Sequence, residues 1–378
     1  METLLHHLIT TRGKSSPSST ALTYKQQTIN YGQLFQSVSS LAVSFSDIGV
    51  KRHQRIAIYL PKKIENVVAM FSASAVGAVF VPVNPILKSD QVSFILEDCA
   101  VSLLVTSSDR LKQLKDGLSK CHALETIILI DKPRQTIEID QQVNIVLWEE
   151  VQNNVDEMPQ DIGIDNDIVS ILYTSGSTGH PKGVLLSHRN MLAGARSVAQ
   201  YLNNDQNDRL LAALPFSFDY GLSQLTTAFS VGASVVLMDY LFPKDVIKAV
   251  DKYKITGLAA VPPLWIQLSQ LDWPETCSLR YFTNSGGTMP VDVLDKLRQT
   301  LPQATPYLMY GLTEAFRSTY VPPENIDTHK DSIGIAIPNA EVLVLREDGT
   351  ECEDNEPGEL VHRGALVAQG YWNAPEKT

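Results

Sequence analysis

Short apolar runs alternate along the chain with longer stretches whose apolar residues recur every three or four positions. The runs are rich in branched side chains, as in buried strands, whereas the longer stretches have the spacing of surface helices. The clearest runs are Arg55–Leu60, Val101–Val105, Thr126–Ile130 and Ser234–Leu237, and the clearest helical stretches are Leu111–Leu118 and Val291–Leu301. This alternation predicts an α/β fold with mostly parallel sheets.

The end of the chain has a different pattern. Ala340–Leu345 and Glu359–His362 alternate like strands around the turn Arg346–Gly349, which predicts a small β-rich subdomain. The polar, acidic segment Gln152–Asp167 has little periodicity and reads as a surface linker that leads into a strand at Ile168–Tyr173. We therefore expect approximate subdomains at residues 1–165, 166–325 and 326–378.

The first residues predict a short helix rather than a secretory leader, because no basic segment precedes an apolar stretch. The most apolar stretch, Val67–Val83, contains Gly77 and Pro82 and is shorter than the roughly 20 residues of a membrane span. It is interpreted as a core helix that runs into a buried strand. The adjacent His6 and His7 are expected to be solvated.

Composition narrows the classes of function. The chain has 378 residues, 44% of them hydrophobic, so it can bury a large core. Its formal net charge of −11 disfavours a nucleic-acid surface, which needs basic stripes. The four cysteines are far apart, which argues against a zinc site and against a secreted disulfide framework. A cytoplasmic location is the simpler expectation.

The strongest local signal is YTSGSTGHPKGV, which spans Tyr173–Val184 after a predicted buried strand. Its glycines free the backbone and its hydroxyl groups add donors, so the loop can wrap a polyphosphate, with Lys182 supplying a positive charge. The spacing differs from that of a Walker loop, in which glycine, lysine and serine or threonine follow one another directly. A kinase or GTPase of that class is therefore disfavoured.

Two later segments offer groups for a nucleotide. Tyr281–Thr288 is a predicted strand that ends at two glycines, where backbone amides can face a planar base or a phosphate. Taken alone, it is equally compatible with an ordinary strand-to-helix turn. Leu308–Phe316, with the sequence LMYGLTEAF, places an aromatic ring, a hydroxyl group and a carboxylate in one turn. Such groups can stack on adenine, hold a phosphate oxygen and help to bind Mg²⁺.

With these motifs in order, followed by GELVHRGALVAQGYWNAPEKT at the end, the chain resembles the adenylate-forming superfamily. This superfamily includes acyl-CoA synthetases, the adenylation domains of non-ribosomal peptide synthetases, and luciferases. The resemblance implies the large N-terminal lobe of that fold, with two mostly parallel sheets sandwiched by helices and a small β-rich subdomain. It also implies ATP-dependent activation of a carboxylic acid as its acyl-AMP, with ATP and Mg²⁺ bound.

The resemblance also implies roles for single residues. The triphosphate would be handled by Thr174, Ser175, Gly176, Ser177, Thr178, Gly179 and Lys182. Ser285, Gly286, Gly287 and Thr288 would flank the adenine and the acid, with Tyr310 and Gly311 beside the adenine. Thr313 would contact the α-phosphate and Glu314 would bind Mg²⁺, so the implied catalytic residues are Lys182, Thr313 and Glu314.

The sequence ends at Thr378, where the family continues into a small mobile lobe. In the family that lobe contributes the lysine that stabilises the adenylation transition state. The chain is therefore expected to be the large lobe only, with the small C-terminal lobe absent. Such a fragment should bind nucleotide and acid but catalyse slowly.

The segment Leu214–Gln224 is where the family lines its acid pocket, and here it contains Phe218–Asp219, as in domains that activate amino acids. A carboxylate in an apolar pocket needs a cation, which favours a substrate with an ammonium group. The resemblance suggests a pocket formed by Phe218, Asp219, Tyr220, Ser223, Ala260, Ser285, Met309, Arg317 and Ser318. The sequence as a whole resembles that of stand-alone ligases that activate L-proline, so proline is the first choice among amino acids.

Three alternatives remain open. Asp219 could instead pair with Arg317, and the chain would then be an acyl-CoA ligase for a fatty acid or other non-amino acid, or for an acid with a second carboxylate. A carrier-protein phosphopantetheine thiol or coenzyme A could accept the acyl group. A non-catalytic protein that binds AMP or ATP is the alternative of another class, although intact Lys182, Thr313 and Glu314 argue against it.

Overall fold

The structure is a computed structural model that describes residues 2–137, 139, 142–152, 157–174 and 181–378. The chain forms two compact units, which are described separately. Unit 1 comprises Met1–His188, Pro215–Asp219 and Gln369–Thr378, and unit 2 comprises Arg189–Leu214 and Tyr220–Ala368. In the described part of the chain, no helix is both long and apolar enough to cross a membrane. The three subdomains expected from the sequence stay a prediction.

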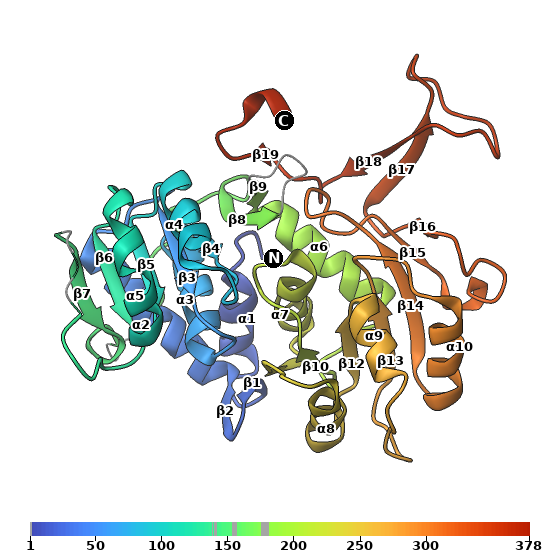
Figure 1. The fold of residues 1–378 in the computed structure, drawn as a ribbon, viewed down its shortest axis with the longest axis horizontal. Helices are drawn as coiled ribbons and strands as arrows, with labels where there is room; N and C mark the ends of the chain where they lie inside the picture. The colour runs from blue at the N-terminus through green and yellow to red at the C-terminus, as the bar shows by residue number, and fades with distance from the viewer. Residues whose placement is uncertain (1, 138, 140–141, 153–156, 175–180) are drawn as a thin grey trace. The chain divides into compact units, whose positions relative to one another are not determined.

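Unit 1 is built on an eight-stranded sheet with the order β19-β9-β8-β4-β3-β5-β6-β7 (Figure 1). The strands are β3 (Arg55–Tyr59), β4 (Val79–Pro82), β5 (Leu103–Thr106), β6 (Thr126–Leu129), β7 (Asn144–Leu147), β8 (Ile168–Thr174), β9 (Lys182–Ser187) and β19 (Gly370–Tyr371). Neighbours from β8 through β7 are parallel, whereas β8, β9 and β19 pair antiparallel. The antiparallel end of the sheet therefore carries the residues on either side of the glycine-rich segment.

Helices connect the parallel strands of unit 1. They are α3 (Ile64–Ala75), α4 (Ser89–Asp98) and α5 (Ser108–Leu114), and they follow α1 (His7–Ser15), the hairpin β1 (Thr20–Tyr24) and β2 (Gln27–Asn30), and α2 (Tyr31–Ile48). Ile56 and Ala57 on β3 are both fully buried although they point to opposite faces, as expected for a sheet covered on both sides. The start of α2 is set by a capping box between Asn30 and Gln33, and Gly49 ends it at φ +95°.

Unit 2 contains a second sheet, in which the strands follow the order β16-β15-β14-β13-β12-β10-β11. They are β10 (Arg209–Ala212), β11 (Ser234–Leu237), β12 (Gly257–Ala260), β13 (Tyr281–Asn284), β14 (Thr305–Tyr310), β15 (Thr319–Val321) and β16 (Ile335–Ala336). The neighbouring strands β11, β10, β12, β13 and β14 are parallel, and β15 and β16 return antiparallel. A separate hairpin joins β17 (Ala340–Leu345) to β18 (Glu359–Gly364), as the alternation predicted.

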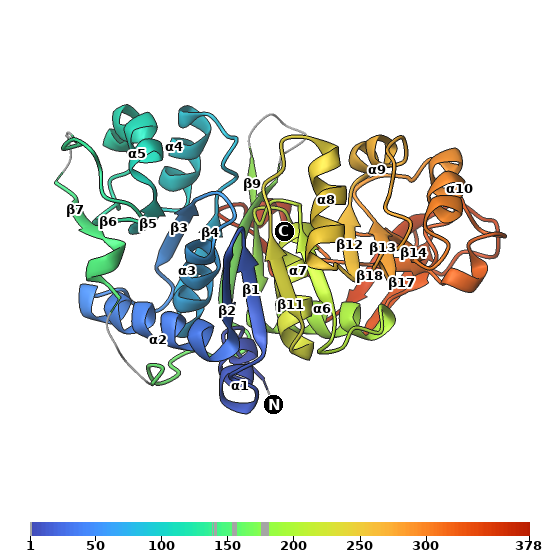
Figure 2. The same cartoon turned by 90° about the horizontal axis from the view of Figure 1, so that it is seen from below.

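Three helices of unit 2 pack apolar side chains into its core. α8 (Pro243–Tyr253), α9 (Pro262–Leu268) and α10 (Val291–Thr300) run along β12–β14 (Figure 2) and pack Val250, Trp265 and Leu297 into one apolar cluster. The other helices are α6 (His188–Tyr201) and α7 (Asp219–Val231). Together the two units confirm the α/β fold with two mostly parallel sheets and a β-rich segment. The helix predicted at Leu111–Leu118 is shorter than expected, because α5 ends at Leu114 and a 3₁₀ helix, Lys115–Lys120, follows.

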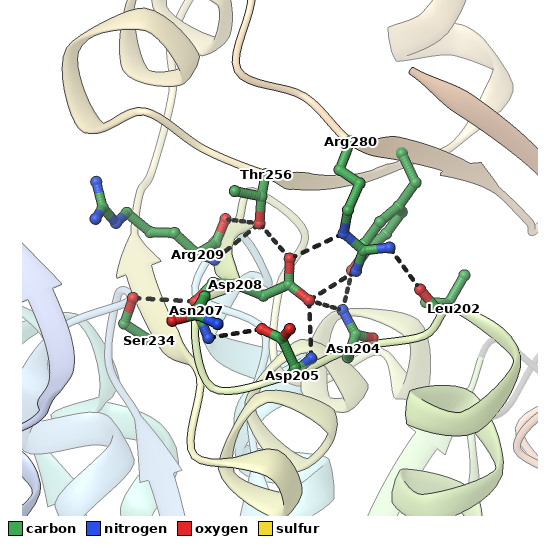
Figure 3. Close-up of polar contacts among 10 residues, drawn as sticks. Leu202, Asn204, Asp205, Asn207, Asp208, Arg209, Ser234, Thr256 and Arg280 are labelled. Carbon is green, nitrogen blue, oxygen red and sulfur yellow. Dashed lines mark hydrogen bonds and ion pairs between the residues drawn. The ribbon is translucent and has the colours of Figure 1, made fainter. Parts of the chain in front are cut away.

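The buried carboxylate of Asp208 connects the amino ends of β10, β12 and β13 in unit 2 (Figure 3). Asp208, only 4% exposed, accepts hydrogen bonds from Arg280 at 2.7 Å, the Thr256 hydroxyl at 2.7 Å and the Asn204 amide at 2.8 Å. Thr256 and Arg280 immediately precede β12 and β13, and Asp208 precedes β10. Burial opposes the charge, but these hydrogen bonds outweigh it and keep the pKa of Asp208 below its ordinary value.

Candidate functional site

The β8–β9 hairpin of unit 1 carries both ends of the predicted phosphate loop. Thr174 is the last residue of β8, Lys182 is the first of β9, and the two are paired across the hairpin. Ser175, Gly176, Ser177, Thr178 and Gly179 lie outside the described residues. Gly183 is needed for packing, because a Cβ there would lie 2.7 Å from Ile171 Cγ2 and 3.2 Å from Trp372 Cβ. The hairpin thus fixes the position of Lys182 at the end of the loop.

Unit 2 contains a cavity of about 430 Å³ at the carboxyl ends of β13 and β14. Six of its lining residues were predicted from the motifs: Gly286, Gly287, Thr288, Met309, Tyr310 and Gly311. Ligands of open parallel sheets bind at the carboxyl ends of strands, so the position suits a ligand site. The volume lies in the range of small-molecule sites, and the exposed backbone at Gly286 and Gly287 is open to a planar group.

The turn after β13 is held by its own residues. The Asn284 side-chain amide donates to the Gly287 carbonyl at 2.9 Å, and Gly286 adopts φ +76°, which favours glycine. Ser285 is 2% exposed and lies in the same turn. This hydrogen bond therefore holds the turn that contains the two glycines expected to lie beside the nucleotide.

The cavity also has a wall that the motifs did not reveal. It is lined by Lys330, Asp331, Ser332 and Ile333. This segment lies between β15 and β16, which return antiparallel beside β14 after the YGLTE motif. Lys330 is held by an ion pair with Asp295 of α10 at 2.7 Å. Gly334, directly after this segment, is the local sequence signal for the wall. Glycine is needed there because a Cβ would lie 2.0 Å from the Tyr320 carbonyl oxygen.

Thr313 and Glu314 lie in a tight loop that follows β14. The backbone amide of Ser318 donates to the Tyr310 carbonyl at 3.0 Å and closes the loop. Gly311 permits this closure, because a Cβ there would lie 2.9 Å from the Arg317 Cα. Thr313 is 9% exposed, Glu314 is partly buried, and the Glu314 carbonyl accepts from the Ala368 amide at 2.7 Å. The closed loop therefore carries a residue with a hydroxyl group followed by a residue with a carboxylate.

The residues predicted for the acid pocket are mostly buried. Phe218 and Asp219 belong to unit 1 by contacts, and Asp219 is the first residue of α7 and 2% exposed. The remaining residues of this set lie in unit 2: Tyr220, Ser223, Ala260, Ser285, Met309, Arg317 and Ser318. Each of these seven is less than 9% exposed.

Arg317 is the buried cation of this set. It is 2% exposed, its guanidinium lies 4.3 Å from the centre of the Tyr220 ring, and it donates to the Phe316 carbonyl. The Tyr220 hydroxyl shares a 2.5 Å hydrogen bond with Thr283 Oγ1. Burial raises the pKa of the Tyr220 phenol above its ordinary value, so the ring stays neutral beside the guanidinium. The structure thus brings Arg317, Tyr220 and the end of β13 together.

His6, His7 and Asp161 form the group of possible metal ligands found among the described residues. The Nε2 atoms of His6 and His7 lie 2.9 and 2.8 Å from the two carboxylate oxygens of Asp161. His7 Nδ1 accepts from the backbone amides of Thr3 and Leu4, which puts the ring proton on Nε2, facing Asp161. A hydrogen-bonded triad fits this better than a metal site.

The expectation that both histidines are solvated is wrong for His6, which is 1% exposed. It was wrong because Asp161, far along the chain, and Ser74 supply hydrogen-bond partners to the buried ring. His188 is also buried, and its Nδ1 accepts from the Leu5 amide at 2.9 Å. Burial lowers the pKa of His188 to about 3, which suits a structural role better than that of a general base near neutral pH.

Comparisons with known proteins agree with this geometry. The chain is 30% identical to 4-coumarate--CoA ligase 3 of Arabidopsis thaliana over 92% of the chain and 63% of that protein. It is 27% identical to malpinin synthetase of Mortierella alpina, over 99% of this chain and 5% of that protein. The chain thus spans less than two thirds of the length of these relatives.

Solved structures show the same fold. VinN in complex with L-aspartate aligns with a TM-score of 0.86 and 27% identity, over 99% of this chain and 91% of that chain. The long-chain-fatty-acid-CoA ligase FadD1 of Archaeoglobus fulgidus aligns with a TM-score of 0.89 at 24% identity, over 99% of this chain and 78% of that chain, and shows the fold alone. The family model for AMP-binding enzymes matches residues 9–372, so the chain belongs to the AMP-binding enzyme family.

Proposed function

We propose that this chain binds ATP with Mg²⁺ and activates a carboxylic acid as its acyl-AMP, releasing pyrophosphate. The observation that carries the proposal is the cavity of about 430 Å³ at the carboxyl ends of β13 and β14. Its lining includes Gly286, Gly287, Tyr310 and Gly311, and the chain continues from Gly311 into the loop that contains Thr313 and Glu314. These groups suit a nucleoside and the phosphate attached to it.

In this proposal each motif supplies different groups. Thr174, Ser175, Gly176, Ser177, Thr178, Gly179 and Lys182 bind the triphosphate. Ser285, Gly286, Gly287, Thr288, Tyr310 and Gly311 hold the adenosine. A carboxylate oxygen of the acid attacks the α-phosphorus, the bond to the β-phosphate oxygen breaks, and pyrophosphate leaves. Lys182 and Thr313 stabilise the charge on the phosphate oxygens.

The residues present fit a magnesium ion. Glu314 is only partly buried, and it follows Thr313 in the loop that the hydrogen bond from Ser318 to Tyr310 closes. Mg²⁺ prefers oxygen ligands and takes one or two carboxylates together with substrate phosphates, so Glu314 is the residue that would hold it. When bound, the ion neutralises phosphate charge. The protein's own contribution is to keep the carboxylate at a fixed position through the closed loop.

The proposed acid is an amino acid, with L-proline as the first choice. Phe218–Asp219 resembles the pair found in domains that activate amino acids, where the aspartate holds the ammonium group, and Asp219 is 2% exposed. Phe218, Tyr220, Ser223, Ala260, Ser285, Met309 and Ser318 form the remaining wall of the pocket in this proposal. The acceptor of the acyl group is a carrier-protein thiol, with coenzyme A as the alternative, in the cytoplasm.

The second candidate is an acid other than a simple amino acid, and the buried Arg317 is the observation that favours it. A guanidinium that is 2% exposed can neutralise Asp219 or bind a second carboxylate of the substrate. VinN has been solved with L-aspartate and with 3-methylaspartate, which carry both an ammonium group and a second carboxylate. Aspartate therefore belongs in the same test as proline.

Pyrophosphate exchange into ATP tests the proposal. The chain is assayed with proline, aspartate, 4-coumarate and a fatty acid, and the affinity for ATP with Mg²⁺ is measured in parallel by calorimetry. We expect ATP binding, and exchange that depends on one class of acid. Lys182→Ala and Glu314→Ala should weaken binding or exchange while thermal stability is kept. A wild-type chain that neither binds ATP nor exchanges would refute the activity.

A further inference from the structure

Lys182 is held against an aromatic ring that comes from the far end of the chain. Its ammonium nitrogen lies 5.6 Å from the centre of the Tyr371 ring, within the roughly 6 Å over which a ring face attracts a cation. Both residues belong to unit 1. Lys182 borders the predicted phosphate loop. Interactions that fix the position of Tyr371 therefore also affect the position of the Lys182 ammonium group.

The backbone around Tyr371 is paired directly to the strand that begins with Lys182. β19 lies beside β9 (Figure 1), with Tyr371 opposite Val184 and Gly370 opposite Leu185. The Trp372 amide donates to the Gly183 carbonyl at 2.8 Å. The backbone of Tyr371 therefore cannot shift along β9 without breaking backbone hydrogen bonds.

A second set of contacts anchors β19 to helix α4. The indole nitrogen of Trp372 donates to the Asp98 backbone carbonyl at 2.8 Å, and the side-chain amide of Asn373 donates to the same carbonyl at 3.2 Å. The Arg55 guanidinium lies 5.3 Å from the centre of the Trp372 ring. Asp98 is the last residue of α4, so β19 is fixed to a helix of the core as well as to β9.

We propose that Tyr371 is a positioning residue for Lys182. Its ring holds the ammonium group at the end of the hairpin, so that the cation is already aligned when the triphosphate arrives. A lysine side chain without such a partner samples many rotamers, and ordering it costs binding free energy. The ring removes part of that cost while leaving the ammonium protons available to phosphate oxygens. This inference rests on the proposed function, because it assigns Lys182 to the triphosphate.

Substitution of the ring separates positioning from simple packing. Tyr371→Leu keeps an apolar side chain but removes the ring face, and we expect KM for ATP to rise three- to tenfold with a smaller change in kcat. Tyr371→Phe should stay within twofold of wild type. Phenylalanines with one, two and three ring fluorines at position 371 should raise KM progressively, because fluorine weakens the negative face of the ring. Packing alone gives no such trend.

A double-mutant cycle with Lys182→Met tests whether Tyr371 acts through the lysine. In the Lys182→Met background, Tyr371→Leu should change ATP affinity, measured by calorimetry, by less than twofold. Tyr24→Leu is the matched control: it removes another tyrosine of unit 1 whose ring lies 5.2 Å from a lysine ammonium, that of Lys25. This control should leave ATP affinity unchanged.

The accessibility of the Lys182 amine gives a readout that needs no nucleotide. Its rate of acetylation by dilute acetic anhydride, followed by mass spectrometry, should rise at least twofold in Tyr371→Leu and stay the same in Tyr24→Leu. Equal rates in wild type and Tyr371→Leu, or equal effects of Tyr371→Leu with and without Lys182, would overturn the inference. Failure of the wild-type chain to bind ATP would instead count against the proposed function, since the acetylation result does not depend on it.

Discussion

Gly194 on α6 is a position where one added carbon should disturb the loop that carries Thr313 and Glu314. A Cβ at residue 194 would lie 2.4 Å from Cδ1 and 2.6 Å from Cε1 of Phe316. Phe316 is fully buried and has φ +59°, so its ring has little room to move and its backbone already adopts an uncommon conformation. Gly194→Ala therefore tests how firmly α6 supports the loop.

The size of the effect follows from the overlap. Carbon atoms pack at about 3.5 to 4.0 Å, so the ring must shift by about 1 Å to accept the new atom. Overpacking of this kind costs about 1 to 3 kcal/mol of stability, partly offset by the roughly 0.5 to 1 kcal/mol that alanine gains over glycine in a helix. A displacement of about 1 Å at a catalytic group can lower the rate about a hundredfold. We therefore expect a modest loss of stability and a large loss of exchange.

Urea unfolding and pyrophosphate exchange measure the two effects separately. The double variant Gly194→Ala with Phe316→Leu removes ring atoms from the site of overlap and should recover at least part of the lost exchange. Phe316→Leu alone is the control for the missing ring. If Gly194→Ala keeps wild-type exchange and stability, then α6 does not set the position of this loop and the reasoning is wrong.

Three further predictions test other parts of the structure. Asp219→Ala should lower exchange with proline at least tenfold, since a charge-assisted contact is worth roughly 1.5 to 3 kcal/mol, and should leave cyclopentanecarboxylate unaffected; equal loss with both acids would argue against an ammonium partner. Asp208→Asn should cost about 2 kcal/mol in urea unfolding without changing ATP affinity, because Arg280 and Thr256 lose a charged acceptor. Burial lowers the pKa of His188 to about 3 in the folded protein, against about 6.5 in the unfolded chain. The contribution of neutral His188 to the free energy of unfolding should therefore be fully present above pH 6.5. It should fall by about 1.4 kcal/mol per pH unit as the pH drops towards 3. His188→Asn keeps an acceptor for the Leu5 amide and should show a shallower fall in urea unfolding between pH 6.5 and 5; an unchanged slope would mean that His188 does not titrate in this way.

Much of the architecture could be predicted because local pattern and packing agree. The run Arg55–Leu60 contains β3, whose apolar side chains are buried as the pattern predicted. The alternating segment Ala340–Leu345 forms β17, which pairs with β18 as expected. The interruption after Leu114 was missed. There, Gly117 lies so close to Ser93 that a Cβ would fall 2.1 Å from the Ser93 hydroxyl oxygen, a contact that no periodicity reveals.

The cavity was predicted only in part for a similar reason. Gly286 and Tyr310 belong to motifs in which residue types and spacing point to a nucleotide, so they could be found from the sequence. Lys330 and Asp331 lie in a polar segment without such a motif, and they reach the cavity only because β15 and β16 fold back beside β14. Long-range returns of this kind depend on the pairing of strands, which a single sequence does not specify.

Buried polar residues occur at both ends of the parallel strands of unit 2, and the sequence alone does not separate their roles. Asp208 and Arg280 lie at the amino ends, where each bonds to a partner fixed in the fold (Figure 3). Asn284 and Ser285 lie at the carboxyl ends of the same sheet, on the turn that borders the cavity. Because strand direction places these groups at opposite edges, substitutions at the amino ends should change stability and those at the carboxyl ends should change nucleotide affinity. A stability loss with unchanged ATP affinity in Asp208→Asn is therefore a test of the strand polarity on which the proposed site depends.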